Sequence, residues 1–338
     1  MLKKLFLNLL LLGVVCTLGL VGMEYAVRFI LPGYNPAGHI RYLDGKGDLP
    51  ALGPANQTLR QYKNAGDFDV MVRFNAYGLR DGKDLVNAGA DDWFAVGDSY
   101  TLGHGVEEDQ RYTNLLEKAI GKPVYNIAIP GDFNQYAKLL AYARSKGAHI
   151  QNLIVGVCME NDLIAYNEVQ TNQPQASVAG QFHASLLHQA KAWMLSKSAL
   201  YVLFTSSVYR VPVLKNAFIK AGLLTPNEEG VMRTAFNPAI VEQSANRLAE
   251  VVAGIPHVVV LIIPSRGLWI PAYAATADQY HQAFVAALRA RGMTVADPRP
   301  LFDALPNPLQ THFFANDGHW NAAGHRLGVE ALVQAIQK

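Results

Sequence analysis

Residues 93–103 read WFAVGDSYTLG and carry the clearest signal for the fold class. Its first four residues are apolar without alternation, which is typical of a strand buried on both faces. The run ends in a Gly-Asp-Ser turn at 97–99, and a helical pattern begins soon afterwards at residue 112. A buried strand that passes through a tight turn toward a helix is the basic unit of a parallel α/β sheet.

This unit repeats along the rest of the chain. Apolar, strand-like runs are followed by amphipathic, helix-like segments, with turn residues between them. Strands are expected at 93–96, 124–128, 152–158, 258–263 and 294–296, and helices at 112–120, 134–146, 238–253, 277–291 and 322–336. Because the strands do not alternate, helices must cover both faces of the sheet. The predicted fold class is α/β, a three-layer α/β/α sandwich with a parallel sheet.

The composition excludes several classes of protein. Of the 338 residues, 50% are hydrophobic and 17% are charged, which is enough apolar material for a packed core. The 29 Lys and Arg against 27 Asp and Glu give a formal net charge of +2 without basic runs, so nucleic acid is not expected as a partner. The two cysteines, Cys16 and Cys158, provide neither a disulfide framework nor a zinc site. No metal and no cofactor are expected, because the sequence has no matching ligand spacing or phosphate-binding loop.

The N-terminus predicts a membrane anchor. Lys3 and Lys4 precede an apolar run at residues 5–23, and a bilayer needs about 20 such residues. The segment VGMEY at 21–25 contains no small-residue cleavage site. We therefore expect an uncleaved single-pass helix in the cell inner membrane, with cleavage as the alternative. By the positive-inside rule the two lysines stay in the cytoplasm, which puts the rest of the chain on the periplasmic side.

Three parts are expected along the chain. Residues 1–31 form the signal anchor, residues 32–91 a linker with an N-terminal decoration, and residues 92–338 the α/β domain. An alternating segment at 67–74 is typical of an edge strand. The α/β rhythm is interrupted at about 163–237 by a helical insertion, which is either core filler or a lid beside the functional site.

Three of the strands are followed by residues that can do chemistry, at the edge of the sheet where loops converge. Ser99 follows the first strand, Gly131 the second and Asn161 the third. A serine at such a turn can present its hydroxyl as a nucleophile, or it can simply cap the next helix together with Asp98. The backbone N–H groups of Ser99 and Gly131 and the amide of Asn161 would form a cradle for a developing oxyanion.

A histidine lies near the other end of the sequence, in the loop NDGHWNAAG at 316–324, just before the last predicted helix. His319 in this loop could return to Ser99 as a general base, with a nearby carboxylate to fix its tautomer. Two further histidines have other interpretations. His104 is expected to start a helix, and His325 to pack or cap.

Taken in chain order, these four blocks resemble those of the SGNH hydrolases, also called GDSL esterases and lipases. The resemblance covers about residues 92–338 and is carried by Gly97, Asp98 and Ser99 with Gly103, by Gly131, by Asn161 and Asp162, and by Asp317 and His319. It implies that Ser99 is the nucleophile, His319 the general base and Asp317 the orienting acid, and that Ser99, Gly131 and Asn161 form the oxyanion hole. It also implies a flavodoxin-like sheet.

This chain departs from the family pattern in two places. The family has its acid three residues before the histidine, where this chain has Asn316, whereas Asp317 lies two before His319. An Asp-x-His spacing resembles the alginate O-acetyltransferase branch, and a dyad with a backbone carbonyl as partner is the alternative. In the third block, Met159 stands at the family's glycine position and Glu160 directly precedes the amide.

The resemblance implies an enzyme, a serine esterase or O-acyltransferase that works through an acyl-serine intermediate. A location beyond the membrane favours acyl esters, above all acetyl esters, of cell-envelope or exported glycans as substrates. A lysophospholipase or thioesterase is the second hypothesis, and a non-catalytic envelope scaffold or binding protein is the third. The membrane is the one further partner that the sequence implies, and protein partners are not predicted.

Overall fold

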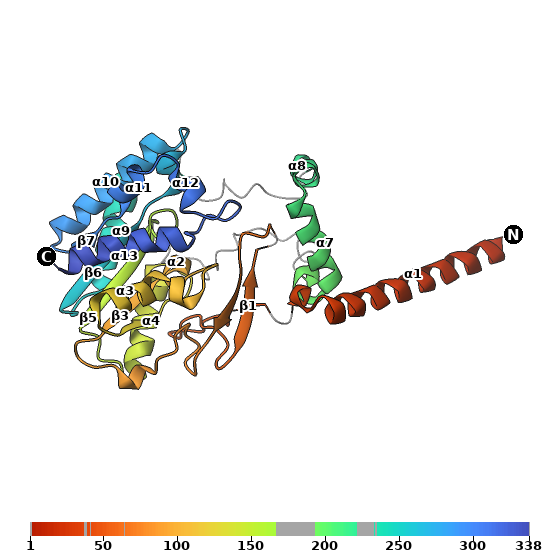
Figure 1. Cartoon of the computed structure of the whole chain (residues 1–338), viewed down its shortest axis with the longest axis horizontal. Coiled ribbons are helices and arrows are strands. Elements are labelled where there is room, and N and C mark those ends of the chain that lie inside the picture. Colours follow the sequence, from red (N-terminus) through yellow and green to blue (C-terminus); the bar gives the residue numbers. More distant parts are fainter. Residues whose placement is uncertain are drawn as a thin grey trace. The chain divides into compact units, whose positions relative to one another are not determined.

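The computed structural model describes residues 2–36, 39–40, 42–63, 65–166, 193–221, 233 and 235–337 (Figure 1). These residues group into two compact units. The first unit comprises the described residues within 1–39, 62–66 and 181–225, and the second unit comprises the other described residues.

The second unit is built around a parallel five-stranded sheet. Its strands are β3 (Trp93–Gly97), β4 (Val124–Asn126), β5 (Asn152–Cys158), β6 (His257–Ile263) and β7 (Thr294–Ala296). They lie in the order β4-β3-β5-β6-β7, and each neighbouring pair is parallel. In chain order this is the 2-1-3-4-5 arrangement of flavodoxin-like sheets, as the resemblance implied. The carboxyl ends of β3 and β5 form the switch point, where such folds place their sites.

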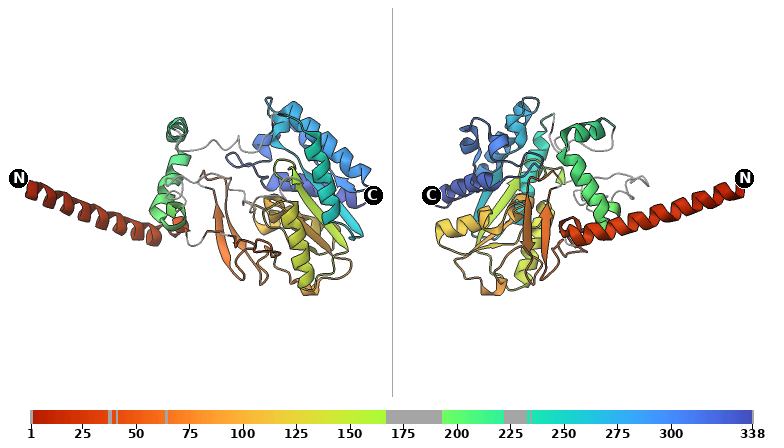
Figure 2. Two further views of the ribbon diagram at one scale, coloured as in Figure 1. Left: turned by 180° about the vertical axis from the view of Figure 1, so that it is seen from behind. Right: turned by 45° about the vertical axis from the view of Figure 1, so that its right-hand side comes forward.

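Helices cover both faces of this sheet (Figure 2). One face carries α3 (Tyr112–Ile120) and α13 (Ala322–Ile336) over a core that includes Trp320 and Phe302. The other face carries α4 (Phe133–Ser145), α9 (Pro238–Val251) and α10 (Ala274–Ala290). β5 is buried from its second residue to its last, because each of its faces meets one of these helical layers. The prediction of a three-layer α/β/α sandwich is confirmed.

A second, smaller sheet pairs β1 (Thr58–Tyr62) with β2 (Asp69–Arg73). β2 lies within the predicted edge strand, and its alternate residues Val70 and Val72 are buried in the main core with Phe74. Part of the segment expected to be a linker thus packs against the large sheet. The remaining short elements of this unit are η3 (Leu85–Asn87), α2 (Ser99–Leu102), η4 (Glu108–Gln110), η5 (Arg266–Trp269), α11 (Arg299–Asp303) and α12 (Pro308–Thr311).

The first unit consists mainly of helices: α1 (Leu2–Ile30), η1 (Pro32–Tyr34), α7 (Ala199–Arg210) and α8 (Pro212–Lys220). Among the described residues, α1 is the one helix that is long and apolar enough to cross a membrane. Glu24 of α1 caps α7, because its carboxylate accepts Ser198 Oγ–H and the Ala199 N–H, both at 2.8 Å.

The predicted insertion is helical where the structure describes it, in α7 and α8. Its segments 167–192 and 222–232 lie outside the described residues. The choice between core filler and a lid beside the site stays a prediction.

Candidate active site

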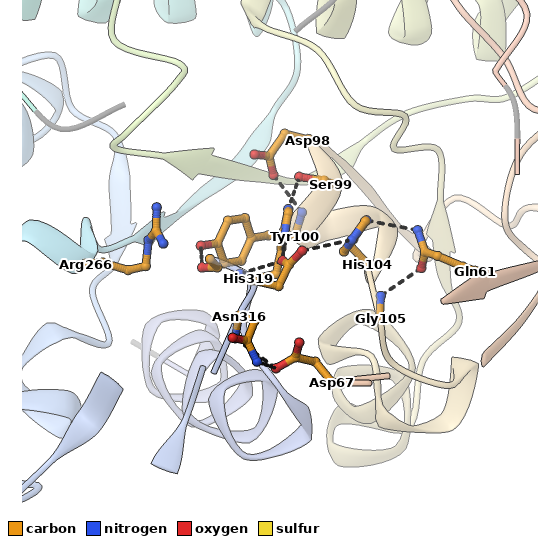
Figure 3. A network of polar contacts seen from close by, with 12 residues as sticks. Gln61, Asp67, Asp98, Ser99, Tyr100, His104, Gly105, Arg266, Asn316 and His319 are labelled. Carbon is orange, nitrogen blue, oxygen red and sulfur yellow. Dashed lines mark hydrogen bonds and ion pairs between the residues drawn. The ribbon is translucent and has the colours of Figure 1, made fainter. Parts of the chain in front are cut away.

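Ser99 directly follows the Gly-Asp turn after β3, at the first residue of α2 (Figure 3). The turn depends on Gly97, because a Cβ atom there would come within 2.0 Å of the hydroxyl of Thr101. Asp98 is the N-cap of α2, and its carboxylate accepts the N–H of Tyr100 at 2.9 Å. Since Asp98 does the capping, the hydroxyl of Ser99 can serve another partner.

That partner is His319, from the loop before α13. Ser99 Oγ lies 2.7 Å from His319 Nε2. On the other side of the ring, His319 Nδ1–H donates to Asp317 Oδ1, which also accepts the backbone N–H of His319 at 3.2 Å. One carboxylate oxygen thus holds both the ring and the backbone two residues later, which explains how an Asp-x-His spacing can orient an imidazole. The structure brings the three residues into one hydrogen-bonded series.

Asn316, at the family's usual position for the acid, serves the loop instead. Its backbone N–H and its side-chain amide donate to Asp67 Oδ1, at 2.9 and 3.3 Å. The N–H of Phe314 donates to the carbonyl of His319 at 3.0 Å. These contacts hold the histidine loop at both of its ends.

The two carboxyl groups near His319 have opposite pKa shifts. Burial alone would raise the pKa of Asp317, but hydrogen bonds from His104 and His319 hold it far below its ordinary range. Burial raises the pKa of Asp98, and this effect exceeds the opposing attraction of His319. Asp317 is therefore the carboxylate that keeps a firm negative charge beside the imidazole.

A second histidine shares Asp317. His104 lies after the end of α2, not at the start of a helix as expected, and its Nε2 is 3.7 Å from Asp317 Oδ2. Its ring stacks on that of His319, with centroids 4.2 Å apart and planes 26° apart. Gln61 of β1 contacts the other ring nitrogen of His104, with Nε2 at 2.9 Å from Nδ1. By contrast, His325 is buried within α13, as predicted, and its Nδ1 accepts the N–H of Tyr112.

Of the three expected oxyanion donors, two are backbone N–H groups without an acceptor within the described ranges, and one is a side-chain amide that already donates a hydrogen bond. In the part of the chain that the structure describes, the N–H groups of Ser99 and Gly131 have no hydrogen-bond acceptor. The amide of Asn161 is tied to the nucleophile loop, because its Nδ2 donates to Asp98 Oδ2 at 3.2 Å. A side-chain amide has a second N–H, which can serve a substrate oxygen. The buried Oδ1 of Asn161 has no partner among the described residues.

Glu160, which differs from the family pattern in the third block, supports the histidine loop through Arg266. Its carboxylate pairs with Arg266 Nη2 at 3.0 Å and accepts the Arg266 N–H at 2.7 Å, and both side chains are largely buried. The guanidinium packs against Gly318, where a Cβ atom would come within 2.5 Å of Cζ. The hydroxyl of Tyr100 donates to the carbonyl of Gly318 at 2.5 Å. The residue before His319 is thus fixed from two sides by groups that no motif marks.

Three side chains of the site also have the chemistry of metal ligands. Ligand atoms of His104, Asp317 and His319 lie within 4.8 Å of one another. The two ring nitrogens of His319 are already used, one toward Ser99 and one toward Asp317. Both ring nitrogens of His319 thus take part in the hydrogen-bonded series, and we assign no metal to the site.

A serine hydroxyl, an imidazole and a carboxylate in series define the site of a serine hydrolase. Residues 218–338 match the family model described as SGNH hydrolase-like domain, acetyltransferase AlgX. The match confirms the resemblance to the SGNH hydrolases and the likeness to their alginate acetyltransferase branch. Over these residues, which include Asp317 and His319, the chain is similar to an SGNH domain of the esterase or acyltransferase kind.

Several solved structures match over most of their length. A member of the lipolytic G-D-S-L family from Veillonella parvula is 11% identical, with a TM-score of 0.42, over 73% of this chain and 98% of the other. The lipase/acylhydrolase from Enterococcus faecalis is 11% identical, with a TM-score of 0.40, over 73% and 95%. A catalytic mutant of an acetylxylan esterase from Geobacillus stearothermophilus is 12% identical, with a TM-score of 0.39, over 74% and 96%. No curated protein matches this chain significantly.

Proposed function

We propose that the chain is a serine esterase or O-acyltransferase with Ser99 as its nucleophile, and that its substrates are acetyl esters of cell-envelope or exported glycans. The observation that carries this proposal is the hydrogen-bonded series of Ser99, His319 and Asp317, in which 2.7 Å separates the hydroxyl from the imidazole. The acetyltransferase description of the family matched by residues 218–338 supports an acetyl group over longer acyl chains.

The first stage of the reaction forms an acyl-serine. Ser99 Oγ attacks the ester carbonyl while its proton moves to His319 Nε2, and the carbonyl oxygen becomes an oxyanion. Asp317 stabilises the imidazolium. The oxyanion accepts hydrogen bonds from the N–H groups of Ser99 and Gly131 and from the Asn161 amide. His319 then returns the proton to the oxygen of the leaving alcohol as the carbon–oxygen bond breaks.

The second stage releases the acyl group by the same path. Water, or the hydroxyl of an acceptor, attacks the acyl-serine while His319 takes its proton. The second tetrahedral intermediate collapses, and the proton passes from His319 to Ser99 Oγ. Water gives hydrolysis and an acceptor hydroxyl gives transfer, so one site serves both activities.

The N-terminal helix α1 supports a periplasmic location for the proposed esterase or acyltransferase reaction. α1 would hold the chain in the cell inner membrane as a single-pass protein, with Lys3 and Lys4 in the cytoplasm and the hydrolase-like domain, residues 92–338, on the periplasmic side. Alkaline phosphatase fused to the C-terminus should then be active, because that enzyme matures only outside the cytoplasm. An inactive phosphatase fusion beside an active cytoplasmic reporter would contradict this topology.

The test of the function is ester hydrolysis by the full chain in detergent. Wild type should hydrolyse an aryl acetate, and Ser99→Ala should lower kcat by at least about 10³-fold. Ser145→Ala is the matched control, since that serine lies at an exposed helix end and should not affect turnover.

A series of acyl chain lengths separates the hypotheses. Rates that rise from acetate to long acyl esters would replace an acetyl esterase by a lysophospholipase or thioesterase. If folded wild type neither hydrolyses any ester nor transfers acetyl to an oligosaccharide, the remaining hypothesis is a non-catalytic scaffold or binding protein.

A further inference from the structure

The buried side chain of Gln61 has a fixed orientation (Figure 3). Its Oε1 accepts the backbone N–H of Gly105 at 2.8 Å, and a backbone N–H can only donate. The Nε2 end of the same amide therefore faces His104 Nδ1, at 2.9 Å. Because a buried amide loses stability when its hydrogen bonds are broken, both contacts hold this orientation.

This orientation determines where His104 carries its proton. An NH₂ group only donates, so His104 Nδ1 must accept and stay unprotonated. The neutral ring then has its proton on Nε2, which faces Asp317 Oδ2 at 3.7 Å. A proton on Nδ1 would set two donors against each other, and Gln61 cannot rotate its amide to relieve this without turning the NH₂ group toward the N–H of Gly105.

The backbone around His104 is fixed as well. The neighbouring residues Gly103 and Gly105 both have positive φ, 86° and 78°. A Cβ atom at Gly105 would come within 2.6 Å of the ring of Phe68. The N–H of His104 donates to the carbonyl of Ser99 at 2.9 Å. The second histidine is thus built into the same turn as the nucleophile.

We propose that Gln61 keeps His104 neutral, so that the charge of Asp317 serves the catalytic histidine alone. This rests on the function proposed above. Beside a carboxylate, a histidine ordinarily gains a proton. A cationic His104 would neutralise Asp317 and place a positive charge next to the imidazolium of His319, whose ring centroid is 4.2 Å away. The neutral ring instead gives Asp317 an N–H and gives the imidazolium an uncharged ring to stack on.

The charges around His104 make such a device necessary. Asp317 and His319, both in the loop before α13, are titratable groups in contact with His104. Phe68, which follows Asp67 in the sequence, packs its ring against His104, and Arg80 binds the carbonyl of the preceding Gly103. The carboxylate of Asp317 favours a cationic ring, whereas Gln61 is a neutral contact that opposes one. Gln61 and His104 are therefore positioning residues, which act through Asp317 on His319.

The test replaces the amide by a carboxylate in the full chain. Glutamate at position 61 can accept both the N–H of Gly105 and a proton on His104 Nδ1, so Gln61→Glu should make His104 an imidazolium. Nitrogen-15 NMR of histidine-labelled protein at pH 7 should show a neutral Nε2–H ring in wild type and a cation in the variant. For an aryl acetate, kcat/KM should fall about tenfold, and the acid limb of its pH profile should move about one unit lower.

His104→Phe is the matched control, because it keeps a stacked ring that cannot be protonated, and it also assigns the NMR signals. In that background Gln61→Glu should change neither the rate nor the pH profile further. A merely structural Gln61 would instead lower the melting temperature and the rate equally in both backgrounds.

Two results would overturn the proposal: a wild-type His104 that is protonated on Nδ1 at pH 7, or an unmoved pH profile in Gln61→Glu. Failure of the proposed function is a different outcome, since wild type would then be inactive or activity would survive in Ser99→Ala, whereas the NMR signals of His104 would still report its protonation.

Discussion

Two loops at the carboxyl edge of the sheet use their aspartates in opposite ways. In the loop before α13, Asp317 binds the ring of His319, which in turn contacts Ser99. In the loop after β5, Asp162 is buried in the protein, and its Oδ2 accepts a hydrogen bond from the hydroxyl of Tyr136 at 2.9 Å. The first loop orients the histidine that contacts Ser99, and the second loop ties its aspartate into the protein interior.

The difference lies in what surrounds each carboxyl group. Asp317 is met by two histidines, whose hydrogen bonds outweigh the effect of burial and keep its pKa low. Asp162 is buried, and burial raises its pKa well above its ordinary value even though Cys158 N–H and Tyr136 donate to it. Both aspartates lie in motifs that resemble those of the family. Their surroundings, not the motifs, show which of them keeps the charge that a base needs.

The largest effect is expected at Asp317. Asp317→Asn should lower kcat by about 10⁴-fold, because the amide can present an N–H to the ring and select the wrong tautomer. Asp162→Asn, the matched change in the other loop, should cost less than about tenfold, since it leaves the series intact. Kinetics with an aryl acetate and circular dichroism for folding measure both. Asp317→Ala separates a catalytic triad from a dyad. Full activity in that variant would mean that Ser99 and His319 act as a dyad and that Asp317 is not required.

A smaller loss is expected at Asn161, the residue of the second loop that would contact substrate. Asn161→Ala should lower kcat by about 10²- to 10³-fold with little change in KM, because one donor to the developing oxyanion is lost. Steady-state kinetics measure the loss, and an unchanged melting temperature shows that the variant is folded. Turnover within a few-fold of wild type would make Asn161 only a structural link to Asp98.

Glu160 tests the supporting role of the second loop. Glu160→Gln leaves the largely buried Arg266 without its counter-charge, which should lower the free energy of unfolding by about 3 kcal/mol. Glu250→Gln breaks an exposed pair with Arg247 and should cost less than about 1 kcal/mol. Urea titrations of both variants compare these values, and equal losses would remove the supporting role from Glu160.

The smallest effect on function is expected at His325, the buried counterpart of His319. Burial, with nearby Arg111 and Arg80, lowers the pKa of His325 from 6.5 to about 3. Below about pH 6.5 the unfolded chain binds a proton here that the folded chain does not, so the folded state loses stability as the pH falls toward 3.

His325→Gln removes the titrating ring and should weaken this loss of stability by up to about 1.4 kcal/mol per pH unit. The carbonyl of the glutamine can still accept the N–H of Tyr112, so the variant should fold. Urea midpoints at pH 7 and pH 5 measure the change. A pH dependence identical to that of wild type would show that His325 is protonated in the folded chain.

Much of the fold was predictable because buried parallel strands leave continuous apolar runs. β5 and α13 begin and end where the sequence placed them. β1 was missed, since its residues TLRQY show neither an apolar run nor clean alternation. Its burial depends on partners elsewhere in the chain.

The candidate site divides in the same way. Ser99, His319 and Asp317 each lie in a recognisable block, so the sequence could pair them. Gln61 and His104 come from positions 43 residues apart, and single polar residues have no period or spacing that links them. Such pairs depend on tertiary packing, which places β1 beside the turn after α2.

The proposed function requires Ser99 to be an activated nucleophile. A fluorophosphonate reacts with such a hydroxyl by losing fluoride and forming a covalent ester, and mass spectrometry of the digested full chain locates the adduct. We expect one adduct, on Ser99, which is absent from Ser99→Ala and His319→Ala and retained in Ser145→Ala. A folded wild type without an adduct, or with its adduct on another residue, would contradict it.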